Sequence, residues 1–280
     1  MTLEEVRKEI DSVDSEIKKL FEKRMLLADA VARVKAETED EIYKPDREKA
    51  IIDRLSAGVD DSIVMEYKAL IKRIMEISRK YQYGRTLELR PDALVIDTAD
   101  AFEPVSVGML KSEVYMKPDR SVKAYDSYDK LADAIDGGVC DAGTAVLENI
   151  GVGISDGLHD CLLDRHFYIN RCEIIDDDGV RRKLATFSRK LVIEPEHNRL
   201  KIAFVCKNHS GSLSSVLSMI SDYGVNLTEI HSSPFEAEEW NYVFYIEMTA
   251  NLTVREDRAL IYQLMNETDM LAILGSYVCG

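Results

Sequence analysis

The sequence predicts three domains: an all-α domain, an α/β domain and a C-terminal α+β domain with the ferredoxin-like order of elements. An apolar period of 3.6 residues runs through residues 1–86 without any strand pattern. Strands and helices alternate over residues 87–197, which is typical of an α/β layer. Residues 198–280 follow the order strand, helix, strand, strand, helix, strand. A length of 280 residues fits two or three domains.

The amino-acid composition limits the classes of protein and of binding partner that fit this chain. The 46% apolar fraction can build real cores, and the chain has no run of eighteen apolar residues. Its acidic, amphipathic N-terminus is unlike a signal peptide, so we expect a cytoplasmic protein. A net charge of −15 argues against nucleic acid or an anionic membrane as partner. An anionic small molecule would need a local cationic pocket.

The cysteines give no sign of a metal centre. There are five, scattered and without CxxC spacing: Cys140, Cys161, Cys172, Cys206 and Cys279. Reduced thiols fit this pattern better than a disulfide framework or a metal site. We expect neither a metal nor a cofactor.

The first predicted helix, roughly Leu3 to Ala36, carries two cations in or beside its apolar stripe. Thr2 and Glu5 stand three apart, as in a capping box at a helix start. The stripe runs in steps of four and three through Val6, Ile10, Val13, Ile17, Leu20, Leu27, Val31 and Val34. Those steps place Arg24 in the stripe, and Lys35 lies about 20° from the same direction at 100° per residue. The alternative interpretation is an arginine that snorkels from an ordinary helix.

Two more helices are predicted in this domain. Pro45 suits a first helical turn, so residues 46–55 form a short helix, and a third helix covers residues 63–81. Ser78 and Gln82 stand one turn apart beside the stripe of the third helix. The first helix is about 50 Å long at 1.5 Å per residue, too long for these two helices to cover. We therefore infer an intertwined homodimer or a higher homo-oligomer.

Polar residues collect on the inner faces of these helices. They are Arg7, Arg24, Lys35, Arg47, Glu48, Ser78 and Gln82. Four cations, one carboxylate and two neutral donors suit a ligand with two carboxylates and a hydroxyl. The ordered set "VRKEIDSVDSEIKKLFEKR", "VARVK", "PDREKAIIDRL" and "EISRKYQ" resembles the all-helical class of chorismate mutase, as found at the N-terminus of bifunctional chorismate mutase–prephenate dehydratases.

The resemblance implies a Claisen rearrangement of chorismate to prephenate, which needs no nucleophile, base or metal. Lys35 and Gln82 would hydrogen-bond the ether oxygen of the breaking C–O bond, where negative charge develops. Arg24 would bind a substrate carboxylate through its bidentate fork, and Arg7 would reach in from the other subunit.

The remaining site residues follow from the same resemblance. Glu48 would hold the ring hydroxyl, Arg47 would position it, and Ser78 would help to bind the ring carboxylate. The chain departs from the family at Lys44, where an acidic residue often precedes the Arg-Glu pair.

The middle segment, residues 87–197, is predicted to begin with a strand at "ALVIDTA". The stretch "SYDKLADAIDGGVCDAGTAVLENIGVG" resembles part of a prephenate dehydratase domain, with Glu148, Asn149 and Gly153 at matching positions. The glycine-rich loop expected after the first strand reads "TADAFEP", and Thr186 and Phe187 have no arginine between them as the family's catalytic signature would require.

The segment is also too short for both lobes of such a domain, which belongs to the periplasmic-binding-like class. A single lobe leaves no cleft to exclude water from a substrate. We expect a structural or regulatory remnant that does not dehydrate prephenate, in which Glu148 and Asn149 are turn residues.

Residues 198–280 resemble the ACT regulatory domain through "SGSLSSVLSMISDYGVNLTEIHSSPFEAEEWNYVFYIEM". Relatives that bind phenylalanine use the first strand-to-helix turn, here Gly211, Ser212 and Leu213, with a later Glu-Ser-Arg-Pro motif. Here that motif reads His231, Ser232, Ser233 and Pro234, without either charged residue. Either the domain binds an aromatic amino acid or it only assembles subunits.

The sequence thus favours a chorismate mutase of phenylalanine or tyrosine biosynthesis, acting on chorismate and releasing prephenate. Two alternatives stay open. One is a bifunctional enzyme with residual dehydratase activity. The other is a catalytically silent amino-acid sensor whose helices serve only for dimerisation, although such a module would gain stability from apolar residues at Arg24 and its partners.

Overall fold

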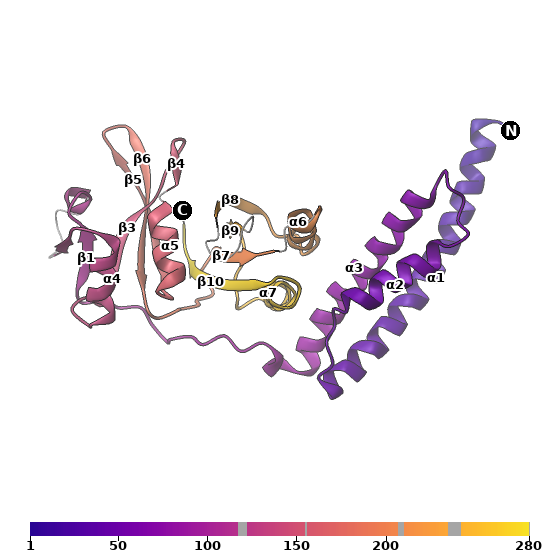
Figure 1. The fold of residues 1–280 in the computed structure, drawn as a ribbon, viewed down its shortest axis with the longest axis horizontal. Coiled ribbons are helices and arrows are strands. Elements are labelled where there is room, and N and C mark those ends of the chain that lie inside the picture. Colours follow the sequence, from indigo (N-terminus) through magenta and orange to yellow (C-terminus); the bar gives the residue numbers. More distant parts are fainter. Residues whose placement is uncertain (117–121, 155, 207–209, 235–241, 280) are drawn as a thin grey trace. The chain divides into compact units, whose positions relative to one another are not determined.

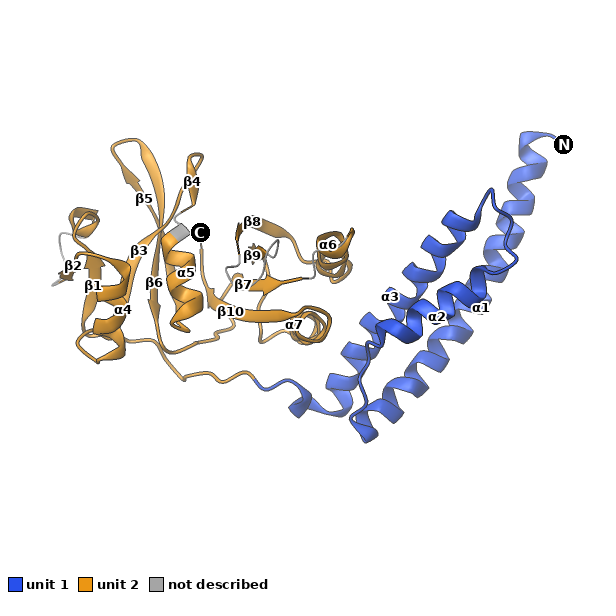
Figure 2. Ribbon diagram, in the orientation of Figure 1, with its two compact units in different colours: residues 1–95 blue, residues 96–280 orange. Residues whose placement is uncertain are grey.

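The structure is a computed structural model that describes the chain except for residues 117–121, 155, 207–209, 235–241 and 280. The chain forms two compact units, residues 1–95 and residues 96–280 (Figure 2). None of the helices among the described residues is long and apolar enough to cross a membrane.

The first unit is helical, as predicted. Its helices are α1 (Leu3–Thr38), α2 (Pro45–Ser56) and α3 (Val64–Leu89), followed by a short 3₁₀ turn at Pro91–Ala93. The predicted capping box is present, because the Thr2 side chain accepts a hydrogen bond from the backbone N–H of Glu5 and the Glu5 side chain accepts one from that of Thr2. Helix α3 continues past Tyr81, where the prediction ended it. Helices α1 and α3 pack along each other (Figure 1).

Only part of α1 is covered. Ala28 and Ala32 are buried, and their small side chains let the neighbouring helix approach closely. The apolar stripe is otherwise open: six of its residues are more than half exposed, namely Ile10, Val13, Ile17, Leu20, Leu27 and Val34. Most of the stripe is therefore not covered by the described residues of this chain.

The second unit is built on one ten-stranded sheet. Its strands are β1 (Val107–Leu110), β2 (Val122–Tyr125), β3 (Ala142–Asn149), β4 (Gly153–Ile154), β5 (Tyr168–Asp177), β6 (Val180–Ser188), β7 (Arg199–Val205), β8 (Leu227–Pro234), β9 (Tyr242–Met248) and β10 (Met270–Tyr277). Their order is β2-β1-β3-β6-β5-β10-β7-β9-β8, with β4 paired to β3. Strands β1, β2 and β3 are parallel, and β6 returns antiparallel between β3 and β5.

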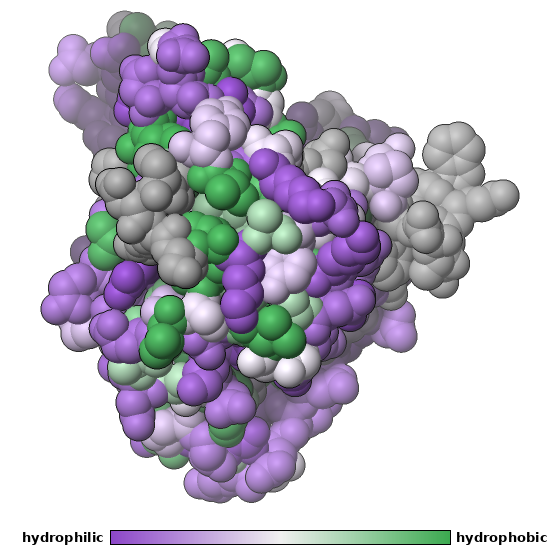
Figure 3. Space-filling model, turned by 90° about the vertical axis from the view of Figure 1, so that its left-hand side faces the viewer, coloured by the Kyte–Doolittle hydropathy of each residue, from purple (hydrophilic) through white to green (hydrophobic). Residues whose placement is uncertain are grey.

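The helices divide this unit into two parts. The middle lobe consists of β1–β6 with α4 (Tyr128–Asp136) and α5 (Asp156–Asp164). The C-terminal domain consists of β7–β10 with α6 (Ser212–Asp222) and α7 (Arg255–Glu267), in the predicted ferredoxin-like order. On the face that carries β1, β2 and α4, polar residues surround several small apolar groups (Figure 3). The sequence also predicts strands at "SVKAYDS" and "LKIAFVCK", and one end residue of each, Ser121 and Lys207, lies outside the described residues.

The predicted strand at "ALVIDTA" is wrong. Within the described part of the chain this stretch makes only an isolated bridge between Ala99 and Val192, and Val95 is 78% exposed, so it does not form a strand. The first strand of the lobe is instead β1, which the sequence analysis missed because it is short and contains Gly108. A Cβ at Gly108 would lie 2.5 Å from Cδ1 of Leu131, so the glycine lets α4 pack closely on the strand. The loop after the first strand is therefore not "TADAFEP", which precedes β1.

The lobe and the C-terminal domain share one sheet and one core, which the sequence did not indicate. Strand β10 pairs antiparallel with β7 and parallel with β5. The joint with β5 rests on a single register pair, Gly275 with Ile169. A Cβ at Gly275 would lie 2.4 Å from the backbone oxygen of Ile169, so only glycine allows this approach.

Replacing Gly275 by alanine should therefore weaken the second unit. We expect Gly275→Ala to lower its free energy of unfolding by roughly 2–4 kcal/mol, because the new methyl group must push β5 away. Denaturant unfolding followed by circular dichroism measures this change. The control is Gly84→Ala in α3, where a Cβ meets nothing within 4 Å and a helical alanine should stabilise slightly. Equal stability of Gly275→Ala and the wild type would contradict the close approach.

Candidate functional site

A cavity of about 330 Å³ opens between the three helices of the first unit. Six of the seven predicted site residues line it: Arg24, Lys35, Arg47, Glu48, Ser78 and Gln82. The rest of the wall is mainly apolar, made of Leu27, Ala28, Val31, Ile42, Ile51, Leu55, Ile71, Ile74 and Met75, with Lys44 and Arg79. Five cations and one carboxylate thus face the same space in a chain of net charge −15. The cavity suits a small anion with an apolar body.

Lys35 is fixed at the C-terminal end of α1. Its side chain is buried, and its Nζ donates to the backbone oxygens of Glu41 at 2.6 Å and Ile42 at 3.0 Å. The chain can turn back over Lys35 because Glu39 adopts a left-handed conformation (φ 56°). Burial lowers the pKa of Lys35, and the Asp40 carboxylate partly opposes this shift. The two carbonyls use two of the three N–H groups of an ammonium, which leaves one to point at a ligand.

Arg24 joins α1 to α3. Its Nη1 donates to the backbone oxygen of Ile74 at 3.2 Å and also contacts the Ser78 hydroxyl. Ser78 Oγ donates in turn to the same Ile74 oxygen at 2.9 Å. Partial burial lowers the pKa of Arg24, while the charge of Glu48 acts in the opposite direction. Arg24 therefore does not snorkel into solvent but takes part in the wall of the cavity.

Gln82 stands one turn after Ser78 on α3. Its Nε2 donates to the backbone oxygen of Ser78 at 3.2 Å, which fixes the amide plane. Its Oε1 is buried without a hydrogen-bond partner. A buried acceptor of this kind costs stability, which is usual where a ligand completes the site.

Arg79 was missed by the sequence analysis. Its Nη1 lies 2.5 Å from Glu48 Oε2, with the two side chains 10% and 22% exposed, and its guanidinium stacks on the Tyr43 ring at 4.6 Å. The pair orients the Glu48 carboxylate at the cavity wall. Arg79 stands inside the quoted stretch "EISRKYQ", next to Ser78, but the sequence analysis did not single it out. Lys44 is bound to Asp40 at 2.6 Å.

Arg7 is the one predicted site residue that lies away from the cavity. It is exposed near the start of α1, seventeen residues before Arg24, or about 25 Å along the helix axis at 1.5 Å per residue. No side chain spans that distance, so Arg7 cannot serve the cavity of its own chain.

The predicted effector residues occupy two segments of the C-terminal domain. Gly211 adopts φ 89° at the start of α6, and Ser212 and Leu213 are the first residues of that helix. Ser232 and Ser233 lie on β8. The His231 ring lies 4.4 Å from that of His159 in α5 of the middle lobe and 4.8 Å from that of Tyr245 on the neighbouring strand β9. His231 thus serves the contact between lobe and domain.

The dehydratase-like positions of the middle lobe have structural partners. Asn149 Oδ1 accepts a hydrogen bond from Arg182 Nη1 at 3.0 Å, and Glu148 pairs with Ile154 where β3 turns into β4. The hydroxyls of Thr144 and Thr186 bond each other at 2.9 Å inside the sheet. The expectation that Glu148 and Asn149 are turn residues is wrong, because both end strand β3 and the turn begins at Ile150, but their contacts are structural.

Comparisons with known proteins match both ends of the chain. Residues 6–83 match the family model "Chorismate mutase type II", and residues 201–263 match "ACT domain". A chorismate mutase from Methanocaldococcus jannaschii is 35% identical over 85 residues, which cover 28% of this chain and 86% of the relative.

Two further likenesses extend over the middle of the chain. A bifunctional chorismate mutase/prephenate dehydratase from Aquifex aeolicus is 22% identical over an alignment of 358 residues, covering 98% of this chain and 97% of the relative. That alignment is longer than the 280 residues of this chain, so dozens of positions in the relative have no counterpart here. The crystal structure of a prephenate dehydratase from Arthrobacter aurescens in complex with L-Phe superposes with a TM-score of 0.53 and 15% identity, over 62% of this chain and 90% of that chain.

The Arg79–Glu48 pair yields a prediction for the helical unit. Arg79→Met leaves a half-buried carboxylate without its nearest cation, so it should lower the free energy of unfolding by roughly 1–3 kcal/mol. In the background of Glu48→Gln the same change should cost clearly less, and a double-mutant cycle in urea measures the difference. Arg73→Met provides the control, because the pair of Arg73 with Glu76 is longer and more exposed (3.4 Å, 43% and 17%). Strict additivity at Arg79 and Glu48 would contradict the coupling.

Proposed function

The chain belongs to the chorismate mutase type II family, and from this membership we propose that its helical unit rearranges chorismate to prephenate. The observation that carries the proposal is the cavity itself. Arg24, Lys35 and Gln82 converge on one partly apolar space, and Glu48 stands on its wall. Chorismate has two carboxylates, a ring hydroxyl and an ether oxygen, and these residues offer a partner for each.

The ether oxygen is where the protein can lower the barrier. In the rearrangement the C–O bond breaks as a C–C bond forms, and negative charge develops on that oxygen. Lys35 would donate its remaining N–H to it, and the Gln82 amide would donate the N–H that does not bond Ser78. Both donors are already held by backbone oxygens, so little reorganisation is needed, and each would contribute about 3 kcal/mol in a site without water.

The other residues hold the substrate in its compact chair conformation, which brings the reacting carbons together. Arg24, braced by Ile74 and Ser78, would bind one carboxylate. Glu48, oriented by Arg79, would accept a hydrogen bond from the ring hydroxyl. Arg47 and Ser78 would position the hydroxyl and the ring carboxylate.

We further propose that the active form is a homodimer in which α1 of each chain covers the other. The stripe from Ile10 to Leu20 is more than half exposed in the single chain, and a second copy would bury it. The same arrangement would bring Arg7 of one chain to the cavity of the other. The dimer thus covers the apolar stripe and completes the site through the same helix.

The two other parts have different proposed roles. The middle lobe would not dehydrate prephenate, because the positions expected to be catalytic are engaged within the sheet and the relative's additional segment is missing. The ACT domain would bind an aromatic amino acid and regulate the mutase in phenylalanine or tyrosine biosynthesis. These two roles and a cytoplasmic location are proposals that follow from the sequence analysis.

Assays of the purified protein with chorismate and then with prephenate test the function. We expect chorismate to disappear and prephenate to accumulate unchanged. Lys35→Ala should lower kcat by roughly 10²- to 10³-fold with a smaller effect on KM, because its contact strengthens as the bond breaks. Lys23→Ala, an exposed lysine of the same helix, is the control and should match the wild type. Phenylpyruvate formed from prephenate would instead support the bifunctional alternative, and no turnover of either substrate would support the silent sensor.

Mixed dimers test whether Arg7 acts across the subunit boundary. Arg7→Ala and Lys35→Ala homodimers should both be nearly inactive. In a mixed dimer one cavity keeps its own Lys35 and receives an intact Arg7, so equal refolded mixtures should recover about a quarter of wild-type activity. If the mixture is no more active than the two variants alone, Arg7 does not act in trans.

A further inference from the structure

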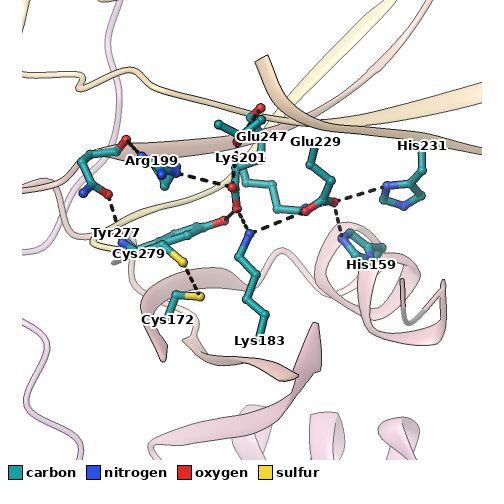
Figure 4. Close-up of polar contacts among 12 residues, drawn as sticks. His159, Cys172, Lys183, Arg199, Lys201, Glu229, His231, Glu247, Tyr277 and Cys279 are labelled. Atoms are coloured by element: carbon teal, nitrogen blue, oxygen red, sulfur yellow. Dashed lines mark hydrogen bonds and ion pairs between the residues drawn. The ribbon is translucent and has the colours of Figure 1, made fainter. Parts of the chain in front are cut away.

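The joint between the middle lobe and the C-terminal domain carries a cluster of titratable and thiol groups that the mutase chemistry does not use (Figure 4). Strands β5 and β10 meet here at one register pair, far fewer than the seven pairs that join β10 to β7. The backbone alone holds the two parts weakly at this point, so side chains must supply most of the connection.

Charged side chains supply part of it. Lys183 of the lobe contacts Glu247 of β9, and Lys201 of β7 lies 2.5 Å from Glu229 of β8. The Tyr277 hydroxyl donates to Glu247 Oε2 at 2.5 Å. The pKa of Glu247 is lowered by the Lys183 ammonium in spite of its burial. Arg199 lies 3.6 Å from Glu247 as well, so three cations face two carboxylates and this layer has no excess of negative charge.

The same charges argue against a metal ion at the neighbouring triad of His159, Glu229 and His231. Their ligand atoms lie within 4.8 Å of one another, which by distance alone could hold a cation. Lys201 already takes Glu229 Oε1, and Lys183 stands 3.7 Å from Oε2. A divalent ion would add to these buried positive charges, so the triad is better explained as part of the ionic layer.

Two thiols complete the joint. Cys172 on β5 donates to Sγ of Cys279, two residues after β10, with the sulfur atoms 3.3 Å apart. Cys279 is held in place because its backbone N–H donates to Asn198 Oδ1 at 3.0 Å. A disulfide needs about 2.05 Å, so closing this pair requires the sulfurs to move only a little over 1 Å. We propose that Cys172 and Cys279 are an oxidisable pair whose disulfide locks the middle lobe to the C-terminal domain.

The surroundings favour Cys279 as the reacting thiolate. The hydrogen bond from Cys172, helped by the nearby Lys183 ammonium, lowers the pKa of Cys279 to about 7. Burial and the same pairing raise the pKa of Cys172. Other cysteines lack this setting: burial raises the pKa of Cys161 to about 11, and Cys140 is bonded to the Tyr125 hydroxyl at 3.1 Å.

The oxidant we assign is hydrogen peroxide, because Cys279 is only 7% exposed and a small molecule is needed to reach it. The Cys279 thiolate attacks one peroxide oxygen, the O–O bond breaks and a sulfenic acid forms as the other oxygen leaves as water after protonation. The Cys172 sulfur then attacks the Cys279 sulfur, and the sulfenic oxygen leaves with the Cys172 proton as a second water. Two thiols are oxidised and one hydrogen peroxide is reduced to two waters.

The test treats the full-length protein with a small excess of hydrogen peroxide and then counts thiols in denaturant. Of five thiols three should remain, the intact mass should fall by two hydrogen atoms, and peptide mapping should join Cys172 to Cys279. The pair spans 107 positions of the chain, so its closure should raise the melting temperature of the second unit by roughly 5–10 °C, reversed by dithiothreitol.

Serine variants distinguish oxidation of the Cys172–Cys279 pair from oxidation of other residues. Cys172→Ser and Cys279→Ser should each abolish the mass loss and the thermal shift, whereas Cys206→Ser should retain both. Peptide mapping of the oxidised wild-type protein tests the Cys172–Cys279 disulfide directly, so the proposal stays testable even if a serine variant folds poorly. Five remaining thiols, a different pairing, a cross-link between chains or an unchanged melting temperature would each overturn the proposal. The outcome is independent of mutase activity, which is assigned to the other unit.

Discussion

The structure of the helical unit depends on the length of α1. A helix of 36 residues is about 54 Å long, whereas α2 has 12 residues and α3 has 26. The neighbouring helices cover its C-terminal part, and there the cavity forms around Lys35 and Arg24. They leave apolar residues exposed along its N-terminal part, where Arg7 lies. The difference in helix length thus leaves both a cationic cavity and an exposed apolar stripe along α1, and the proposed dimer would cover the stripe and bring Arg7 to the cavity.

Lys35 in the helical unit is held differently from the buried lysines of the sheet unit. In the cavity the hydrogen bonds of Lys35 go to two backbone oxygens and not to a carboxylate, which leaves its charge able to attract an anionic ligand. In the sheet unit Lys183 and Lys201 each face a carboxylate at short range. Lys35 can therefore still bind an anionic ligand, whereas Lys183 and Lys201 hold strands of the sheet together. The contrast agrees with assigning chemistry to the helices and assembly to the sheet.

Much of this could be predicted from the sequence because its signals were local and periodic. The capping box of α1, the positions of Arg24 and Lys35 relative to the stripe and the βαββαβ order are each set by residue spacing. Arg79 was missed because its role depends on Glu48, thirty-one positions away, and not on its own helix face. The first strand of the lobe was misplaced because "ALVIDTA" has the composition of a strand. The actual strand β1 contains Gly108, which lacks a side chain and so lets α4 pack closely, but glycine is not typical of a strand. The fusion of two domains into one sheet depends on contacts across more than a hundred residues, and no local pattern reports them.

The position of β10 in the sheet also has a consequence for biosynthesis. This strand follows all the others in the chain, yet it lies between β5 and β7 and is the only direct strand-to-strand link between the two halves of the described sheet. During translation the lobe strands emerge first, and their edge at β5 has to wait until the whole C-terminal domain has been made. The helical unit, by contrast, is complete by residue 95 and has no such dependence on later sequence. We therefore expect the helical unit to fold while the chain is still being translated. The sheet can be completed only after β10 has emerged from the ribosome.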